Sequence, residues 1–482
     1  MEKLQGLEPK RVFHYFEELS KIPRCSYDEE NISNYIKGVG EKLGLETIQD
    51  ETLNVIIRKP ASKGYENSEG VIIQGHMDMV CEKEDDKEHD FSKDPIDLII
   101  DGDYIHADNT TLGADNGIAV AMGLALLEDN TLEHPPIELV VTTAEEVEMD
   151  GALGLSEDIL KGRRLLNIDT EEEGVLIAGS AGGELIKVSI PLQYEEISDC
   201  NQMTIQVRGL MGGHSGGEIH KPRGNSNKIL NSILKELKES MDIRLISISG
   251  GTKDNAIPRQ TTAIIGVKNS DLSQFESKIE DIKNKVIEKY KNEEPEIDIV
   301  ITKEGSVSKV FNKDVFDSLV FLIDSIPTGV FTKLPDNEDI VESSSNLAII
   351  KIEEEKLTIE VSTRSSSDKI LLSLRERILE EVNKTNAEYQ IGGKYPEWEY
   401  NPHSKLRDTA VKVYKDMFNK EMETTVIHAG LECGVFAKKY PGLDIISFGP
   451  DMYDVHTPKE RLSISSTKRS YEYLVELLKN LK

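Results

Sequence analysis

Histidine and acidic residues follow the ends of four apolar stretches, a pattern that can bring metal ligands together. One stretch, VIIQGHMD, ends on His76 and Asp78. The other three lead to the remaining members of the set, which are Glu145, Glu146, Asp169 and His456. Imidazole and carboxylate groups without thiolates suit zinc, cobalt or manganese. The residue types therefore make a metal site the first hypothesis.

The elements that must position these residues are strands and one apolar helix. Residues 54–58, 71–74, 137–143 and 165–168 are predicted strands, and NGIAVAMGLALLED between them is a predicted helix. This alternation predicts an α/β layer with a largely parallel sheet. Open α/β sheets bind ligands beyond the carboxyl ends of their strands. Asp115, just before the helix, lies on that side if the connection is a normal crossover.

Each candidate also has a purely structural interpretation. A single histidine at a strand end is usually structural, and Asp115 could simply be a helix N-cap. Glu145 and Glu146 could form a solvated loop, and Asp169 could begin an acidic turn. Taken singly, the structural interpretation is the stronger one for each residue. Their recurrence at one kind of location favours a shared site.

Length and charge restrict the class of protein. The chain has 482 residues, which predicts two or three domains, and a net charge of −31, which argues against nucleic acid and anionic membrane surfaces. No apolar run is long enough for a membrane span, and the N-terminal residues resemble an amphipathic helix more than a signal peptide. We therefore expect a cytoplasmic protein with an acidic, solvated surface.

The four cysteines (Cys25, Cys81, Cys200 and Cys433) are widely scattered and form no CxxC pair. So few cysteines in so long a chain predict no disulfide framework, and a reducing cytosol fits best. A zinc site built on thiolates is equally disfavoured.

The middle of the chain has a different pattern from the two ends. Residues 203–302 are predicted as βαββαβ, the order of a ferredoxin-like domain. Residues 313–391 nearly repeat it, with a first strand missing or unrecognised. We therefore predict an α/β domain with a mixed sheet flanked by helices, formed by residues 1–185 and 401–482. An inserted α+β lid domain, residues 186–400, interrupts it and has two related halves.

Six motifs together resemble one known family. They are GHMDMV, DNTTLGADNG, TTAEEVEMDGALGL, NIDTEEEG, GLMGGHSGGEIHKPRGN and HAGLECG. In order and content they are similar to the aminoacyl-histidine dipeptidases, cytosolic members of the co-catalytic di-zinc peptidase superfamily. With His456, the matching positions extend over nearly the whole chain.

The resemblance implies two divalent metal ions, zinc first, with cobalt and manganese as alternatives. It places His76 and Asp169 on one ion, and His456 and Glu146 on the other. Asp115 would bridge the two, because a bidentate anion spans two close cations and offsets their repulsion. A water between such ions has its pKa drawn toward neutrality.

The resemblance also implies the catalytic residues. Glu145 would be the general base that takes a proton from the attacking water and returns it to the leaving amine. Asp78 would orient the imidazole of His76. In extended backbone, consecutive side chains point different ways, so Glu146 could bind metal while Glu145 faces substrate. A cis peptide between Asp115 and Asn116 is implied as well.

The motif GHSGG competes with this interpretation, because it matches the G-x-S-x-G of serine hydrolases. A nucleophilic Ser215 would need a helix directly after the turn, yet EIHKPRGN follows. The resemblance instead makes His214 a donor to the substrate's carbonyl group, stabilising the oxyanion. The insertion would then act as a lid whose closure completes the site.

Substrate recognition requires a cation for the free carboxylate. Arg364, at the end of a predicted strand, suits bidentate binding, with a surface arginine as the equal alternative. The weaker candidates for substrate contact are Asn255, His428 and Gly430, followed by Arg223 and His220.

These observations predict a metallo-exopeptidase that hydrolyses dipeptides, preferentially aminoacyl-histidine. An N-acyl-amino-acid deacylase of the same superfamily is one alternative. A metal-binding relative without turnover is another, although Glu145, the base it would be expected to lack, is present. The predicted partner is the dipeptide substrate. A homodimer and a single chain that covers its own site both remain open.

Overall fold

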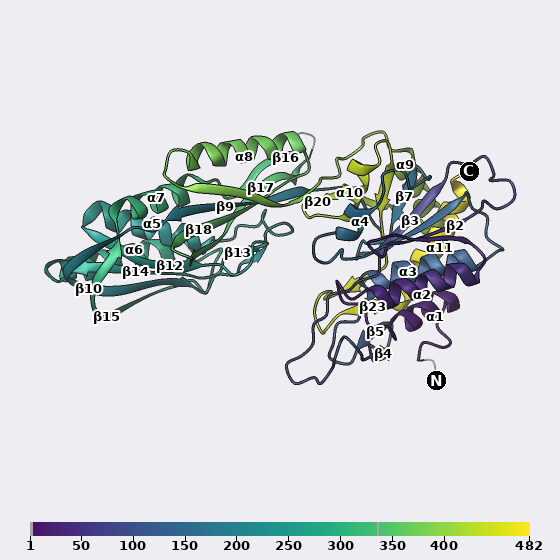
Figure 1. Ribbon diagram of the computed structural model, residues 1–482, viewed down its shortest axis with the longest axis horizontal. Coiled ribbons are helices and arrows are strands. Elements are labelled where there is room, and N and C mark those ends of the chain that lie inside the picture. Colours follow the sequence, from purple (N-terminus) through teal and green to yellow (C-terminus); the bar gives the residue numbers. More distant parts are fainter. Residues whose placement is uncertain (1–2, 335–336) are drawn as a thin grey trace. The chain divides into compact units, whose positions relative to one another are not determined.

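The computed structural model describes residues 3–334 and 337–482 and divides the chain into two compact units (Figure 1). Unit 1 comprises Met1–Ser180, Trp398–Val426 and Leu431–Lys482. Unit 2 comprises Ala181–Glu397 and the short segment Ile427–Gly430. Unit 2 is thus an insertion in the chain of unit 1, with one later loop added to it.

In the described part of the chain, unit 1 contains a sheet of eight strands with a parallel centre. In spatial order the strands are β1 (Glu46–Gln49), β2 (Val55–Lys59), β6 (Ile137–Thr142), β3 (Val71–His76), β7 (Arg164–Asn167), β21 (Asp444–Ser447), β8 (Val175–Ser180) and β20 (Glu423–Ile427). β6, β3, β7 and β21 are parallel neighbours, whereas β2 and β8 run antiparallel to theirs. The predicted mixed α/β sheet is confirmed.

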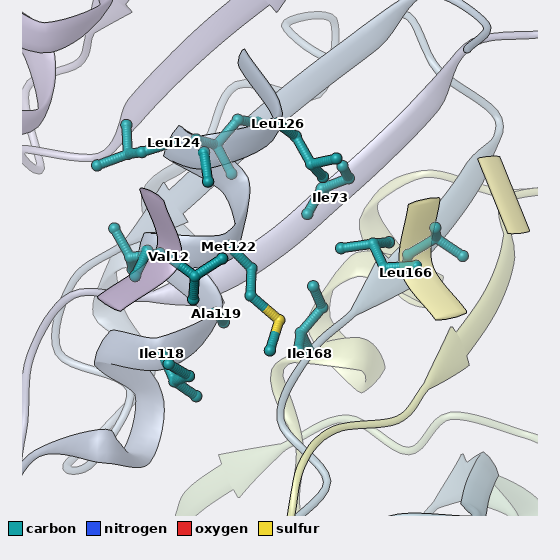
Figure 2. Packing of buried hydrophobic residues seen from close by; sticks show 14 of the residues in the cluster. Val12, Ile73, Ile118, Ala119, Met122, Leu124, Leu126, Leu166 and Ile168 are labelled. Atoms are coloured by element: carbon teal, nitrogen blue, oxygen red, sulfur yellow. The ribbon is translucent and has the colours of Figure 1, made fainter. Parts of the chain in front are cut away.

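Helices cover this sheet and bury its apolar strands. They are α1 (Lys10–Leu19), α2 (Glu30–Lys42), α3 (Ala114–Glu128), α4 (Asp150–Gly154), α9 (Lys405–Phe418), α10 (Glu432–Lys439) and α11 (Ile464–Asn480). α3 is apolar on every side because it is enclosed between β3 and α1. Figure 2 shows Met122 and Leu126 of α3 gathered with Ile73 and Ile168. Met77, between His76 and Asp78, is 1% exposed and belongs to this cluster.

A smaller antiparallel sheet completes unit 1, with the order β22 (Met452–Tyr453), β23 (Arg461–Ser463), β5 (Tyr104–Ala107) and β4 (Leu98–Asp101). It pairs the segment before α3 with the segment after His456. Strands of this sheet therefore precede Asp115 and flank His456, two of the predicted metal ligands.

Unit 2 is built on a second sheet, of nine strands among the described residues. In spatial order it runs β15 (Asp298–Phe311), β10 (Tyr194–Arg208), β14 (Thr261–Lys268), β12 (Ile243–Gly250), β17 (Asn337–Glu353), β18 (Lys356–Ser365), β9 (Gly182–Pro191) and β19 (Glu388–Tyr395), with β16 (Gly329–Leu334) added on β17. Its helices are α5 (Ser226–Ser240), α6 (Leu272–Tyr290), α7 (Lys313–Ser325) and α8 (Asp368–Val382). α5 packs against α6 and α7, and α7 packs against α8 (Figure 1). The last pair, β11 (Gly213–His214) and β13 (Ala256–Ile257), is separate.

The sheet of unit 2 consists of two equivalent halves that meet where β12 pairs with β17. The first half has the spatial order fourth, first, third, second strand, as in ferredoxin-like domains. The second half, read from β19 toward β17, has the same order if β9 is counted as its first strand. β9 precedes the whole first half in the sequence, which explains why the near-repeat seemed to lack a strand.

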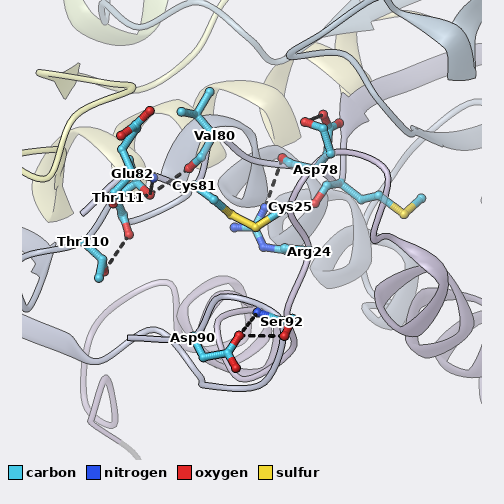
Figure 3. The surroundings of a disulfide bond; sticks show 12 residues. Arg24, Cys25, Asp78, Val80, Cys81, Glu82, Asp90, Ser92, Thr110 and Thr111 are labelled. Carbon is cyan, nitrogen blue, oxygen red and sulfur yellow. Dashed lines mark hydrogen bonds between the residues drawn. A yellow bond between two sulfur atoms is a disulfide. The ribbon is translucent and has the colours of Figure 1, made fainter. Parts of the chain in front are cut away.

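A disulfide joins Cys25 and Cys81 in unit 1 (Figure 3). The sequence analysis missed this bond, because the two cysteines are 56 residues apart and share no motif. They become neighbours because the segment after α1 pairs with the segment after β3, through a bridge between Cys25 and Met79. Cys200 and Cys433 are free and buried. Within the described residues, no helix has the length and apolar character needed to cross a membrane.

Candidate metal centre

Asp115 lies between two imidazoles at the carboxyl edge of the large sheet. Its Oδ1 is 3.2 Å from Nε2 of His76, the last residue of β3, and its Oδ2 is 3.1 Å from Nε2 of His456. The N-cap position of α3 is Gly113, so Asp115 is not the cap that the structural interpretation required. One carboxylate therefore presents one oxygen to each of two histidines.

Three further carboxylates approach the same imidazoles. Glu146 Oε2 is 2.9 Å from His456 Nε2, whereas Asp169 Oδ1 and Glu145 Oε2 are 3.7 and 3.9 Å from His76 Nε2. They converge because parallel β3, β6 and β7 end at one edge and each is followed by members of the set. All five candidate metal ligands and Glu145 therefore meet at one place.

Asp78 connects His76 to the loop that carries the two glutamates. Its Oδ1 is 3.3 Å from His76 Nδ1, and its carboxylate accepts hydrogen bonds from the backbone N–H groups of Glu145 and Glu146. These two residues lie in a turn entered through Ala144 at φ 52°, not in extended backbone. The alternation argument for their separate directions was therefore wrong. A tight turn whose N–H groups bond to Asp78 positions them instead.

The cluster contains more buried carboxylates than imidazoles, and this excess shifts the pKa values of its members. Burial raises the pKa of Glu145 to about 8, with neighbouring carboxylates adding to the rise, and burial also raises the pKa values of Glu146 and Asp169. Hydrogen bonds to Asp115 and Glu146 raise the pKa of His456 to about 11. Burial would lower the pKa of His76, but its carboxylate neighbours hold that pKa well above the usual value.

This charge pattern and donor set fit divalent cations. Protons on the cluster offset the mutual repulsion of the carboxylates, and cations would displace them, because metal ligands bind deprotonated. Oε1 of Glu146 is buried without a hydrogen-bond partner, an arrangement that a metal contact would satisfy. The ligand atoms of His76, Asp115 and Glu146 lie within 4.8 Å of one another.

Three residues that support the cluster escaped the sequence analysis. Glu460 accepts hydrogen bonds from the backbone N–H groups of residues 112–115 and so fixes the loop that carries Asp115. Arg24, fully buried, donates to the carbonyl groups of Met77, Asp78 and Gly113. Figure 3 shows Arg24 beside Asp78. Neither Glu460 nor Arg24 stands in a motif, so nothing in the sequence marks them.

The third missed residue is Glu432, in the motif HAGLECG. It is fully buried and accepts hydrogen bonds from Gln74 Nε2 (2.6 Å) and Thr142 Oγ1 (2.7 Å), at the ends of β3 and β6. Burial raises its pKa to about 8. Its place in a quoted motif was the available signal, but only His428 and Gly430 were taken from that motif.

His214 and Ser215 lie in unit 2. His214 Nδ1 accepts hydrogen bonds from the backbone N–H groups of Gly216 and Gly217 (3.2 and 3.0 Å), so the proton of the neutral ring is on Nε2. Burial lowers its pKa, which keeps the ring neutral. Ser215 is buried, and the next helix starts only at Ser226, so the nucleophile-elbow geometry is absent here.

Of the substrate-contact candidates, Arg364 and His428 come together in unit 2. Ser344, which pairs with Arg364 across the sheet, has its Oγ 2.7 Å from His428 Nε2. Arg364 Nε and His428 Nδ1 are buried without hydrogen-bond partners. Burial, and then the charge of Arg364, lowers the pKa of His428 to about 3, so this ring is neutral.

Two further candidates, Asn255 and Gly430, are less constrained. Asn255 is exposed, and its carbonyl oxygen accepts a hydrogen bond from Ser215 N (2.8 Å). Gly430 is half-buried in the loop that follows β20. Their part in substrate contact stays a prediction.

An α/β sheet that gathers imidazoles and carboxylates at one edge defines a class, the metal-dependent hydrolases. Within it the chain belongs to Peptidase family M20/M25/M40, whose model matches residues 72–480. The sequence prediction of a peptidase in this superfamily is thereby confirmed.

Individual relatives support this family assignment over the full length of the chain. The chain is 37% identical to the cytosol non-specific dipeptidase of Escherichia coli (strain K12) over 491 aligned residues, covering 100% of this chain and 99% of the relative. Its structure matches that of the aminoacylhistidine dipeptidase from Vibrio alginolyticus with a TM-score of 0.90 and 33% identity, over 99% of this chain and 97% of the other. A tripeptidase from Staphylococcus aureus, at 15% identity and a TM-score of 0.62 over 98% of this chain and 99% of the other, shares the fold.

Proposed function

We propose that this chain is a metal-dependent dipeptidase that prefers aminoacyl-histidine substrates. The observation that carries the proposal is Asp115, with one carboxylate oxygen beside each of two imidazoles. The names of the Escherichia coli and Vibrio alginolyticus relatives support dipeptides as the substrate class. The second name supports histidine in the C-terminal position. As for the first relative, we propose the cytoplasm as the location.

In this proposal two divalent ions share the cluster, zinc first, with cobalt or manganese as alternatives. His76 and Asp169 would hold one ion, His456 and Glu146 the other, and Asp115 both. When bound, such ions polarise the peptide carbonyl and make a water molecule more acidic.

Glu145 is the proposed general base. A carboxylate at this position accepts the proton of the attacking water and then donates it to the amine nitrogen as the peptide C–N bond breaks. Burial raises the pKa of Glu145, which favours the protonated form from which it donates to the leaving amine. Asp78 keeps the His76 imidazole oriented through Nδ1.

Unit 2 supplies the proposed substrate contacts. His214 presents an Nε2–H group suited to donate to the carbonyl oxygen of the scissile bond. Arg364 binds the free carboxylate, with Asn255, His428 and Gly430 as further contacts. The lid role of unit 2 stays a prediction.

The test combines metal analysis with a small substrate panel. The purified protein should bind close to two equivalents of zinc, cobalt or manganese and release alanine and histidine from alanyl-histidine. Alanyl-leucine, N-acetyl-histidine and carnosine (β-alanyl-histidine) complete the panel. Faster cleavage of N-acetyl-histidine than of every dipeptide would identify a deacylase. Bound metal without any turnover would reject the enzyme.

A further inference from the structure

Four residues form one row across the sheet of unit 2. Ser344 of β17 is opposite Arg364 of β18, Arg364 is opposite Gly183 of β9, and Gly183 is opposite Tyr395 of β19. Residues directly opposite in antiparallel strands have neighbouring side chains on the same face. Because Gly183 has no side chain, Tyr395 and Arg364 are neighbours across the space above it.

The row lies on the face away from the helices. Leu357, Ile359 and Val361 of β18 belong to the core that the helices cover, so residues at even positions, including Arg364, point the other way. The same alternation holds in β9, where Ile186 and Val188 belong to the core. The row is therefore separate from the packing that holds unit 2 together.

A bulge in β19 places Tyr395 in this row. Gly392 pairs with Leu185, but Tyr395 pairs with Gly183, so three steps along β19 correspond to two along β9. Gly393, at φ +55°, supplies the left-handed residue that such a bulge needs. Without the extra residue, Lys394 would be opposite Gly183. The bulge therefore turns the side chain of Tyr395 toward Arg364.

The absence of a side chain at Gly183 is needed for this contact. A Cβ there would be 2.6 Å from Cζ of Tyr395 and would overlap the hydroxyl oxygen. The tyrosine ring therefore lies directly over Gly183, with its hydroxyl end in the row. By contrast, a Cβ at the neighbouring Gly392 would meet open space.

The hydroxyl group, and not the ring face, is what meets the guanidinium. Arg364 Cζ is 6.0 Å from the ring centroid, at the outer limit of a cation–π contact, while the hydroxyl end of the ring lies over Gly183, the residue opposite Arg364. Burial raises the pKa of Tyr395 against the opposing effect of Arg364, so the phenol stays protonated. A guanidinium has only donors, so in a hydrogen bond with Arg364 the tyrosine oxygen would accept, and its own proton would be left for another acceptor.

We propose that Tyr395 is a specificity-determining residue that completes the carboxylate site. Its oxygen holds the Arg364 guanidinium in place, and its O–H donates to the C-terminal carboxylate of the substrate. Arg364 Nε, buried without a partner, is a second donor awaiting an acceptor, as expected for a site that binds an anion. This inference rests on the proposed function, in which Arg364 receives the free carboxylate.

The test is Tyr395→Phe, measured with alanyl-histidine and alanyl-histidine amide. We expect KM for the free acid to rise about tenfold, as for one lost hydrogen bond between charged or polar groups. We expect kcat to change less than twofold and kcat/KM for the amide to stay unchanged. Tyr389→Phe, on the same strand and exposed, is the matched control and should change nothing.

A second pair of variants tests the geometry without removing the hydroxyl. Gly183→Ala should displace the ring and raise KM for the free acid at least as much as Tyr395→Phe, whereas Gly392→Ala should leave it unchanged. Thermal unfolding of all four variants identifies any loss of fold. If Gly183→Ala does not fold, Tyr395→Phe alone decides.

The possible failures are distinguishable. If Arg364→Ala discriminates between acid and amide but Tyr395→Phe does not, the tyrosine inference is wrong and the carboxylate role of Arg364 stands. If neither variant discriminates, the carboxylate site itself is rejected. If the protein cleaves no dipeptide at all, the proposed function fails first.

Discussion

The metal edge of unit 1 and the carboxylate row of unit 2 are built on opposite physical principles. At the metal edge, buried carboxylates crowd two imidazoles, and their charge is excessive until cations offset it. In the row, one cation, Arg364, has the neutral residues Ser344 and Tyr395 as neighbours, and Ser344 is hydrogen-bonded to the neutral ring of His428. In our proposals the first site binds positive charge and the second binds a single negative group.

The two sites also differ in how they are held. The metal edge is fixed by buried polar contacts from Arg24 and Glu460 and by a disulfide close to Asp78 (Figure 3). The row depends on strand register, one bulge and one glycine. We therefore expect changes at the metal edge to affect chemistry and stability strongly, and changes in the row to affect substrate affinity selectively.

The largest effect should come from Glu145→Gln. The amide cannot accept a proton, so kcat should fall about 10³- to 10⁴-fold. Metal content should stay close to that of the unchanged protein, because Glu145 is not one of the five proposed metal ligands. Steady-state kinetics with metal analysis checks both. Near-normal turnover would remove Glu145 as the base.

The next effect concerns stability. The Cys25–Cys81 bond closes a loop of 56 residues, which in the chain-entropy model stabilises the fold by about 4 kcal/mol. Cys25→Ser with Cys81→Ser should lower the free energy of unfolding in urea by up to that amount. A reducing agent should do the same to the original protein.

The double variant provides the control, since the reducing agent should not destabilise it further. Thiol titration of the unfolded, unreduced protein should find two free thiols, those of Cys200 and Cys433. Four free thiols would show that the bond does not form, as first expected from the scattered cysteines and a reducing cytosol.

The fold and the metal edge could be predicted because their signals are local. Apolar strands of four to six residues end directly on His76 and just before Glu145 and Asp169, and parallel strands share one edge. Two of the supporting residues, Arg24 and Glu460, could not be predicted, because they act on backbone groups far along the chain. The row in unit 2 was hidden for a similar reason. Register and a bulge, which no single segment encodes, bring Tyr395 to Arg364.

A third prediction separates orientation from ligation at the metal edge. Asp78→Asn keeps the size of the side chain but leaves one fewer acceptor for His76 and the turn N–H groups. Metal affinity should fall about 10- to 100-fold, as for other residues that orient a ligand. Competition with a chelator measures it. Asp108→Asn, an exposed aspartate paired with Lys87, is the matched control. Unchanged affinity would mean that the turn holds its shape without Asp78.

The last of these effects should be the most selective, and it sharpens the comparison between the two sites. Arg364→Ala should raise KM for alanyl-histidine about 30-fold, the loss expected for charge-assisted hydrogen bonds to a carboxylate. KM for alanyl-histidine amide should barely change, and metal content not at all. Arg377→Ala, an exposed arginine on α8, should leave both constants unchanged. An equal rise for acid and amide would mean that Arg364 supports the sheet and does not read the carboxylate. A cation in a neutral, register-built row would then be a structural feature, and only the metal edge would be a site.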